Sequence, residues 1–280
     1  MQPTSTCKTV GGRCPFGRRS PPCLPTLIES LAAGTTRVVD LTNRLSSETP
    51  TLRLPEPFAN LVDFSLEEVS AYNEPGPFWK HHNISTGEHI GTHLDAPVHW
   101  ASGRDGKDVA SIEPARLVGP ACVLDVSAQV AEDPDFLVDI EHIEAWQAEH
   151  GPLPENAWLL VRTGWDAYAA DRERFLNADE NGPHSPGFTA RCAQWLAESV
   201  PLSGVGVETV GIDAGAGATL EPPFPMHYFL LGHDKYGITS LQNLGELPAT
   251  GALVIVAPLP IVGGTGSPAR VLAFVQDGAA

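Results

Sequence analysis

The chain has 280 residues, of which 42% are hydrophobic, so it is long enough and apolar enough to bury a substantial core. Its formal net charge of −17 argues against nucleic acid and anionic membrane surfaces as partners, because both attract basic proteins. No apolar run reaches the length of a transmembrane helix, and we expect a cytoplasmic protein.

The N-terminal segment differs in composition from the rest of the chain. Residues 1–34 are rich in Pro, Gly, Arg and Ser and contain Cys7, Cys14 and Cys23, three of the five cysteines. This composition predicts an irregular N-terminal arm, and it lacks the apolar segment of a secretory signal. An odd number of cysteines without paired spacing does not indicate a disulfide scaffold. We expect one folded domain over residues 35–280.

Within that domain, β-branched residues predict a strand at 37–42, followed by a turn-rich stretch over 46–57 and a short helix over 66–72. Further apolar runs with strand character lie at 121–126, 157–163, 205–213, 252–257 and 270–275. Two longer helices are expected between these runs. One begins near Asp139 and ends before Gly151, and the other begins near Thr189. The pattern predicts a single α/β domain with a mixed β-sheet core and flanking helices.

Five of the ten histidines fall between residues 81 and 99. Residues 88–99 form the densest part, Glu-His-Ile-Gly-Thr-His-Leu-Asp-Ala-Pro-Val-His. Imidazoles and carboxylates are the side chains that zinc and similar divalent metals prefer as ligands. A single histidine in such a segment would usually be an ordinary hydrogen-bonded residue, whereas this cluster favours a metal site.

The backbone conformation decides which of these side chains can meet. A helix would group only His89 and His93, whereas an extended segment turns His89, His93, Asp95 and His99 to one side. Four residues of straight strand span roughly 13 Å, so the chain must bend between the first two histidines, and Gly91 allows that bend. We therefore predict that His89, His93 and Asp95 bind one metal ion and leave coordination positions open, as catalytic sites do.

His99 lies further along the same face. An imidazole that is not a ligand, placed beside a water activated by the metal, is suited to act as a general base because its ordinary pKa is near neutrality. We predict that His99 is the catalytic histidine.

The pattern His-x-Gly-Thr-His-x-Asp-x-Pro-x-His at residues 89–99 resembles that of the cyclase family of metal-dependent hydrolases, which includes bacterial kynurenine formamidases and isatin hydrolases. The resemblance extends over nearly the whole chain from residue 37. Weaker matching segments, in the family's order, are 38–42, 162–165, 186–187, 211–213 and 266–270. The resemblance implies a swivelling β/β/α-like fold, and it supports the roles predicted above for His89, His93, Asp95 and His99. It also assigns His227 to a distal histidine of the family.

One position departs from the formamidase pattern. Gln242, in the segment Gln242-Asn243-Leu244, stands where the formamidases have glutamate. A neutral amide bridges two cations poorly, so the resemblance to isatin hydrolases implies a single metal ion. Both Mn²⁺ and Zn²⁺ accept two imidazoles and a carboxylate, and we expect one of them as the cofactor.

The activity that the resemblance implies is hydrolysis of a small cyclic or aryl amide by a metal-activated water, with His99 as the base. His227 and Gln242 would hold the oxyanion or the product carboxylate. Trp79 and Trp100 are candidate walls of an apolar slot for a flat ring, although each taken singly is equally consistent with core packing. Family members are commonly dimers or tetramers, so a homodimer or homotetramer is expected.

Four alternatives stay open at this point. An N-formylkynurenine formamidase would need a two-metal site, and a polyketide cyclase would use the same metal to polarise a carbonyl without net hydrolysis. Two histidines and one carboxylate also describe non-haem iron oxygenases. A metal-binding module without catalysis is the fourth.

Overall fold

The structure, a computed structural model, describes residues 24–54, 56–180 and 182–276. The chain divides into two compact units, Met1–Thr36 and Arg37–Ala280. In the first unit, residues 24–32 form helix α1 (Leu24–Ala32), so the irregular arm expected over 1–34 is wrong for this stretch. Leu27 and Leu31 lie at helical spacing with no glycine between them, which favours a helix. Cys7, Cys14 and Cys23 lie outside the described residues, and the boundary at residue 35 stays a prediction.

Eight strands form the largest sheet, in the order β1-β14-β13-β5-β7-β11-β12-β4. A further pairing of β14 with β4 closes seven of them into a barrel-like ring, to which β1 adds an edge. Pairing is parallel from β5 through β7 and β11 to β12 and antiparallel elsewhere in the ring. The strands are β1 (Thr36–Asp40), β4 (His93–Asp95), β5 (Val118–Asp125), β7 (Trp158–Arg162), β11 (Gly204–Val207), β12 (Tyr236–Thr239), β13 (Ala252–Pro258) and β14 (Gly266–Gln276). The predicted mixed sheet of an α/β domain is confirmed.

Alternate residues of the ring strands face two separate cores. Along β7, Trp158 and Leu160 belong to one buried cluster, whereas Leu159 and Val161 belong to the other. This alternation follows from the period of two in a strand. The first cluster gathers residues from every ring strand except β11 and fills the inside of the ring, so the barrel is a packed core.

Strand β11 contributes glycines where the other strands contribute apolar side chains. A Cβ on Gly204 would lie 2.6 Å from the Trp158 ring, and one on Gly206 would lie 2.7 Å from Leu160. The two glycines therefore make room for the large side chains of the neighbouring β7, which explains the Gly-Val-Gly-Val sequence of this strand.

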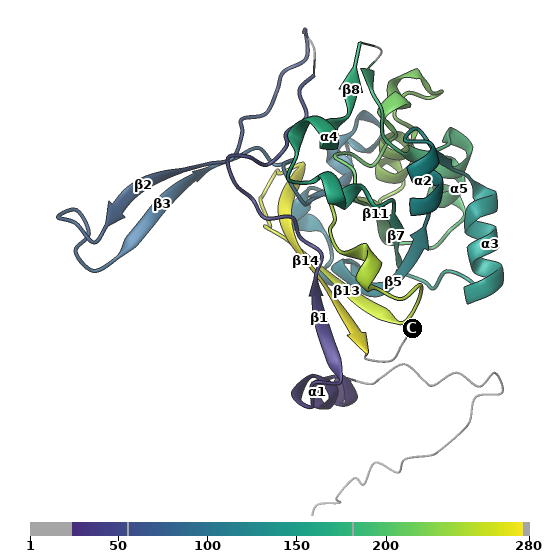
Figure 1. The fold of residues 1–280 in the computed structure, drawn as a ribbon, viewed down its shortest axis with the longest axis horizontal. Coiled ribbons are helices and arrows are strands. Elements are labelled where there is room, and N and C mark those ends of the chain that lie inside the picture. Colours follow the sequence, from purple (N-terminus) through teal and green to yellow (C-terminus); the bar gives the residue numbers. More distant parts are fainter. Residues whose placement is uncertain (1–23, 55, 181, 277–280) are drawn as a thin grey trace, which may run out of the picture. The chain divides into compact units, whose positions relative to one another are not determined.

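Helices cover the outer face of the parallel strands, as Figure 1 shows for α2, α3 and α5 beside β5, β7 and β11. The helices of this unit are α2 (Ser127–Glu132), α3 (Ile140–His150), α4 (Arg172–Leu176) and α5 (Ala190–Glu198). Both predicted longer helices are confirmed with their caps. Asp139 caps α3, which ends at Gly151, and the hydroxyl of Thr189 accepts from the backbone N–H of Cys192 at the start of α5.

The helix expected over 66–72 is wrong. Residues 65–71 form β2 (Ser65–Ala71), which pairs antiparallel with β3 (Lys80–Ser85). Leucine and glutamate favour a helix locally, but cross-strand pairing with a later segment overrides that preference. The other short strands are β6 (Leu137–Val138), β8 (Ala178–Asp179), β9 (Gly182–Pro183) and β10 (Gly187–Phe188).

The predicted strand runs have mixed outcomes. Runs at 121–126, 157–163, 252–257 and 270–275 are confirmed as β5, β7, β13 and β14. The run at 205–213 is a strand only as far as Val207. Among the described residues, no helix combines the length and the apolar character that a membrane crossing requires.

The chain leaves β11 at Glu208, a buried carboxylate that ties the ends of two parallel strands together. Its Oε2 accepts hydrogen bonds from the Thr163 hydroxyl, at 2.7 Å, and from the backbone N–H groups of Thr163 and Gly164, both at 2.7 Å. Its Oε1 is buried without a hydrogen-bond partner among the described residues. Burial, reinforced by the negative charge of Asp166, raises the pKa of Glu208 to about 7.

Glu208 predicts a pH dependence of stability. Because its folded-state pKa is raised above the ordinary glutamate value, the folded protein binds a proton that the unfolded chain has already lost, and stability falls between about pH 4.5 and pH 7. The raised pKa of this one group lowers the free energy of unfolding by about 3 kcal/mol over that pH range. We expect the free energy of unfolding of Glu208→Gln, minus that of the natural chain, to be larger at pH 8 than at pH 5 by about this amount. Urea denaturation at the two pH values measures both free energies. An equal difference between the two proteins at both pH values would contradict the assignment.

Candidate metal centre

The segment 89–99 gathers three imidazoles and a carboxylate by two bends and one short strand. Gly91 has a φ of +61°, a left-handed conformation that favours glycine, and it forms the predicted bend. Strand β4 follows, and because Leu94 belongs to the inner core, His93 and Asp95 face the outer side of the ring. The backbone at 97–99 is a turn of 3₁₀ helix and not the extended chain expected there. That turn, which Pro97 begins, brings the His99 ring onto the His89 ring, with 3.8 Å between centroids.

Asp95 lies at the centre of this group and is 1% exposed. Its Oδ1 lies 2.8 Å from Nδ1 of His89 and 3.3 Å from Nε2 of His93. Ligand atoms of His89, Asp95 and His99 all lie within 4.8 Å of one another. His93 is not part of that group, but its Nε2 contact with Asp95 places it beside the same buried carboxylate.

The unsatisfied atoms of the site fit a divalent cation. The Oδ2 atom of Asp95 is buried and has no hydrogen-bond partner among the described residues. His93 Nδ1 lies 2.8 Å from the carbonyl oxygen of Gly91, to which it donates, so Nε2 carries the lone pair that faces Asp95. Metal-binding histidines commonly donate their second N–H in this way. Acceptors that converge without a donor between them are the chemistry that a cation satisfies.

Glycines on both neighbouring strands make room for this arrangement. Asp95 is paired with Gly237 of β12 on one side and with Gly266 of β14 on the other. A Cβ on Gly237 would lie 3.0 Å from Oδ2 of Asp95, and one on Gly266 would lie 2.5 Å from Cε1 of His89. The position of β4 between two glycines in the closed ring thus allows a buried carboxylate and an imidazole to lie in the same layer.

The charges of the site keep Asp95 ionised and His99 neutral. Burial alone would raise the pKa of Asp95, but the neighbouring imidazoles of His93 and His89 hold it well below its usual range. Burial lowers the pKa of His99 to about 3, against the opposing effect of the negative charge of Asp95. His99 is therefore available as a proton acceptor at neutral pH.

A cluster of aromatic rings adjoins the metal residues. The Trp100 ring lies 4.7 Å from the His227 ring and 5.6 Å from the Phe224 ring, and the His99 ring lies 5.5 Å from His227. Asp213 holds His227 in place, since its Oδ2 lies 2.5 Å from Nδ1 of His227. This leaves Nε2 of His227 on the side of the site, 3.9 Å from Oδ2 of Asp95.

Two of the four predicted substrate residues lie in this cluster of rings and two do not. Trp100 and His227 belong to it, whereas Trp79 follows the turn between β2 and β3, is 48% exposed and contacts the rings of Phe78 and His81. Gln242 donates to the carbonyl oxygen of Leu241. Neither contacts the metal residues through any hydrogen bond or ring contact among the described residues. The substrate roles of both stay predictions without support from the fold.

Sequence reasoning named Asp213 without a definite role and missed Phe224, Thr239 and Thr265. The Phe224 ring contacts the Trp100 ring, and the Thr239 hydroxyl lies 2.9 Å from Nδ1 of His93. The Thr265 hydroxyl lies 2.8 Å from Nε2 of His89. All three follow the histidine cluster by more than 120 residues, and their roles depend on strand pairing that no local pattern reveals.

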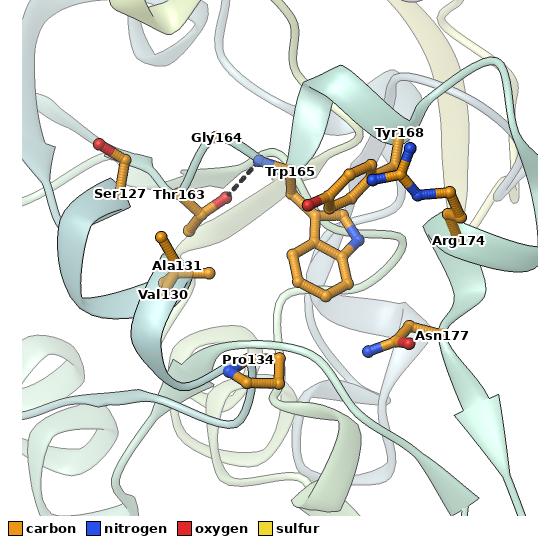
Figure 2. A pocket seen from close by; sticks show the side chains of 10 residues that line it. All are labelled: Ser127, Val130, Ala131, Pro134, Thr163, Gly164, Trp165, Tyr168, Arg174 and Asn177. Carbon is orange, nitrogen blue, oxygen red and sulfur yellow. Dashed lines mark hydrogen bonds between the residues drawn. The ribbon is translucent and has the colours of Figure 1, made fainter.

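One cavity of the described residues lies elsewhere. It has a volume of about 360 Å³ and is lined by residues that follow β5 and β7, with Trp165, Tyr168 and Arg174 among them. Figure 2 shows the guanidinium of Arg174 over the Tyr168 ring, 4.2 Å from the ring centroid. None of the metal residues lines this cavity, so it is not the place where the predicted reaction would occur.

Comparisons with known proteins find similar sequences and structures over most of the chain. The family profile "Cyclase: Putative cyclase" matches residues 39–214. The chain is 45% identical to an isatin hydrolase of Roseibium aggregatum, over 88% of this chain and 94% of that protein. It is 27% identical to a kynurenine formamidase of Bacillus cereus, over 84% and 96% of the two chains. A solved isatin hydrolase bound to the product analogue thioisatinate superposes with a TM-score of 0.88, at 44% identity and over 91% of this chain and 98% of that one.

The arrangement predicts which side chains carry metal affinity. Asp95→Asn and His93→Ala should each weaken Mn²⁺ or Zn²⁺ binding by more than about 100-fold, because each removes a donor atom from the buried site. Isothermal titration of chelator-treated protein measures the change. His233→Ala, which alters an exposed histidine outside the site, is the matched control and should bind as the natural chain does. Unchanged affinity in either ligand variant would remove that residue from the site.

Proposed function

Because the chain belongs to the cyclase family, we propose that it is a metal-dependent hydrolase that opens a small cyclic or aryl amide. The observation that carries this proposal is the gathering of the imidazoles of His89 and His99 around the buried Asp95, beside the rings of Trp100 and His227. The similarity to isatin hydrolases over most of the chain supports the substrate class, since isatin is a cyclic aryl amide.

His89, His93 and Asp95 would hold the metal, and we propose one Mn²⁺ or Zn²⁺ ion per chain. A bound divalent cation supplies Lewis-acid chemistry, in that it polarises a carbonyl group and makes water more acidic. His93 is favoured over His99 as a ligand because its second ring nitrogen is fixed by the Gly91 carbonyl. The His99 ring has no hydrogen-bond partner among the described residues, so its ring nitrogens are available to move a proton.

The protein's own groups divide the remaining work. His99 accepts the proton of the attacking water and then donates it to the leaving amide nitrogen, so that it is neutral again at the end of the cycle. Nε2 of His227, fixed by Asp213, faces the site and is placed to hydrogen-bond an oxygen of the substrate or of the product carboxylate. Trp100 and Phe224 offer flat apolar faces to the ring of the substrate and exclude water from it.

The His99 role gives the direct test of this function. The natural chain loaded with Mn²⁺ or Zn²⁺ should hydrolyse isatin to the ring-opened carboxylate. The absorbance of this product measures the rate. His99→Ala should keep the metal, by titration, and lose turnover by about 100-fold or more. Normal turnover in that variant would remove His99 from the reaction, and no hydrolysis by the loaded natural chain across isatin, N-formylkynurenine and simple lactones would overturn the hydrolase proposal.

N-formylkynurenine formamidase activity is the second candidate, because formamidases of this family are also similar to the chain. It would require a second metal ion, and Gln242 replaces the carboxylate that would bridge it. Metal analysis that gives two equivalents per chain, together with faster hydrolysis of N-formylkynurenine than of isatin, would favour it. The cytoplasmic location expected from the sequence stays a prediction.

We also propose that the chain acts as a homo-oligomer, a dimer or a tetramer. The segment from residue 52 to residue 84 exposes an unusual number of large apolar side chains. They are Leu52, Leu54, Phe58, Leu61, Val62, Leu66, Val69, Tyr72, Phe78, Trp79 and Ile84. Every residue of β3 is exposed, and an isolated two-stranded hairpin is marginally stable in water. A second copy of the chain would supply the surface that this apolar segment lacks.

The oligomer is tested by light scattering coupled to size-exclusion chromatography. The natural chain should elute as a dimer or larger, and the double variant Phe78→Ser, Ile84→Ser should dissociate at concentrations at least tenfold higher. Val262→Ser changes an 89% exposed residue outside this segment and is the matched control. A monomeric natural chain at micromolar concentration would contradict the proposal.

A further inference from the structure

His89 is held through both of its ring nitrogens. Nδ1 lies 2.8 Å from Oδ1 of Asp95, and Nε2 lies 2.8 Å from the hydroxyl oxygen of Thr265. The same Thr265 hydroxyl lies 2.6 Å from Oε2 of Glu88, and the Thr265 backbone N–H donates to that oxygen at 3.2 Å. A chain of contacts therefore runs from the carboxylate of Glu88 through Thr265 to the ring of His89.

The direction of these hydrogen bonds follows from what each group can do. An ionised carboxylate only accepts, so the Thr265 hydroxyl donates its one proton to Glu88. The Thr265 oxygen must then accept from His89, and Nε2 of His89 must carry the proton. Nδ1 is the ring nitrogen that remains for a cation, and it already faces Asp95. In His93 the assignment is reversed, because there Nδ1 donates to a carbonyl and Nε2 faces Asp95.

We propose that Glu88 and Thr265 are positioning residues that commit Nδ1 of His89 to the metal ion. The proposal rests on the metal-dependent function proposed above, and it adds which atom of His89 binds and which residues decide this. The hydrogen bond to Thr265 fixes the orientation of the ring, and the negative charge of Glu88 strengthens that bond through the polarised hydroxyl.

The backbone around Thr265 is built to hold the hydroxyl at this point. The Thr265 carbonyl accepts from the N–H of Ala96, directly after the ligand Asp95, at 2.9 Å. Gly264 and Gly266 flank it, and a Cβ on Gly264 would lie 3.0 Å from Oε1 of Glu88. A Cβ on Gly266 would collide with the His89 ring, at 2.5 Å from Cε1. The Gly-Thr-Gly sequence therefore gives space on both sides to the two side chains that the threonine connects.

Metal affinity measures this role without reference to catalysis. Thr265→Val keeps the shape of the side chain and removes the hydroxyl, so we expect the Kd for Mn²⁺ and Zn²⁺ of chelator-treated protein to rise 10- to 100-fold. Thr265→Ser restores the hydroxyl and should stay within about threefold of the natural chain. Glu88→Gln keeps an acceptor oxygen but loses the charge, and we expect a smaller rise than for Thr265→Val. Thr219→Val, an exposed threonine far along the chain, is the matched control.

The tautomer itself is read by long-range ¹H–¹⁵N NMR of the zinc-loaded protein, with His89→Ala to assign the ring. The proposal predicts that His89 is protonated at Nε2 and coordinated through Nδ1. Coordination through Nε2, natural affinity in Thr265→Val, or no metal binding by the natural chain would each overturn it. The protein could bind metal in this pattern and still hydrolyse none of the amides or lactones tested. That result would support the positioning role and overturn only the hydrolase function. If Thr265→Val does not fold, Glu88→Gln and the NMR measurement still decide.

Discussion

The site depends on one constraint. Several imidazoles direct their lone pairs at a single buried carboxylate. Asp95 is almost fully buried, and one of its oxygens has no partner among the described residues. His93 donates one ring N–H to Gly91, and His89 donates one to Thr265. The second ring nitrogen of each histidine, which faces the other oxygen of Asp95, is therefore an acceptor. Burial of such a group costs several kcal/mol unless a charge of opposite sign compensates it. A divalent cation meets that requirement and brings the chemistry of amide hydrolysis to the same point.

The closed ring of strands makes this burial possible. Strand β4 pairs with β12 on one side and β14 on the other, so Asp95 is surrounded by backbone on both sides. Glycines at the paired positions leave the space that the carboxylate and His89 occupy. The inner core, with Leu94 at its edge, fixes the position of the strand, and the outer face is left for polar chemistry. In this strand of three residues, Leu94 therefore packs in the core on one face, and His93 and Asp95 lie at the site on the other.

The sequence predicted the site better than it predicted the fold around it. The ligand residues share one short segment with a glycine at its bend, so local spacing was enough to group them. The turn at Pro97–His99 was missed because proline is compatible with both extended chain and the first turn of a helix. The β2–β3 hairpin was missed because the residues of 66–72 favour a helix and only their pairing with 80–85 makes them a strand. Trp79 was expected at the site from proximity in sequence; the structure shows it 48% exposed beside the β2–β3 hairpin, and its substrate role stays a prediction. Thr265 and Phe224 reach the site only through long-range topology, which spacing along the chain does not encode.

The central claim is that one cation lies where the donor atoms of Asp95, His89 and His93 converge. Anomalous diffraction from crystals of the Mn²⁺- or Zn²⁺-loaded protein, recorded on both sides of the absorption edge of the metal, locates that ion directly. The account predicts one peak per chain, about 2.0–2.3 Å from a carboxylate oxygen of Asp95, Nδ1 of His89 and Nε2 of His93. A protein that takes up metal but shows its peak at another position, or shows none among these three residues, would contradict it.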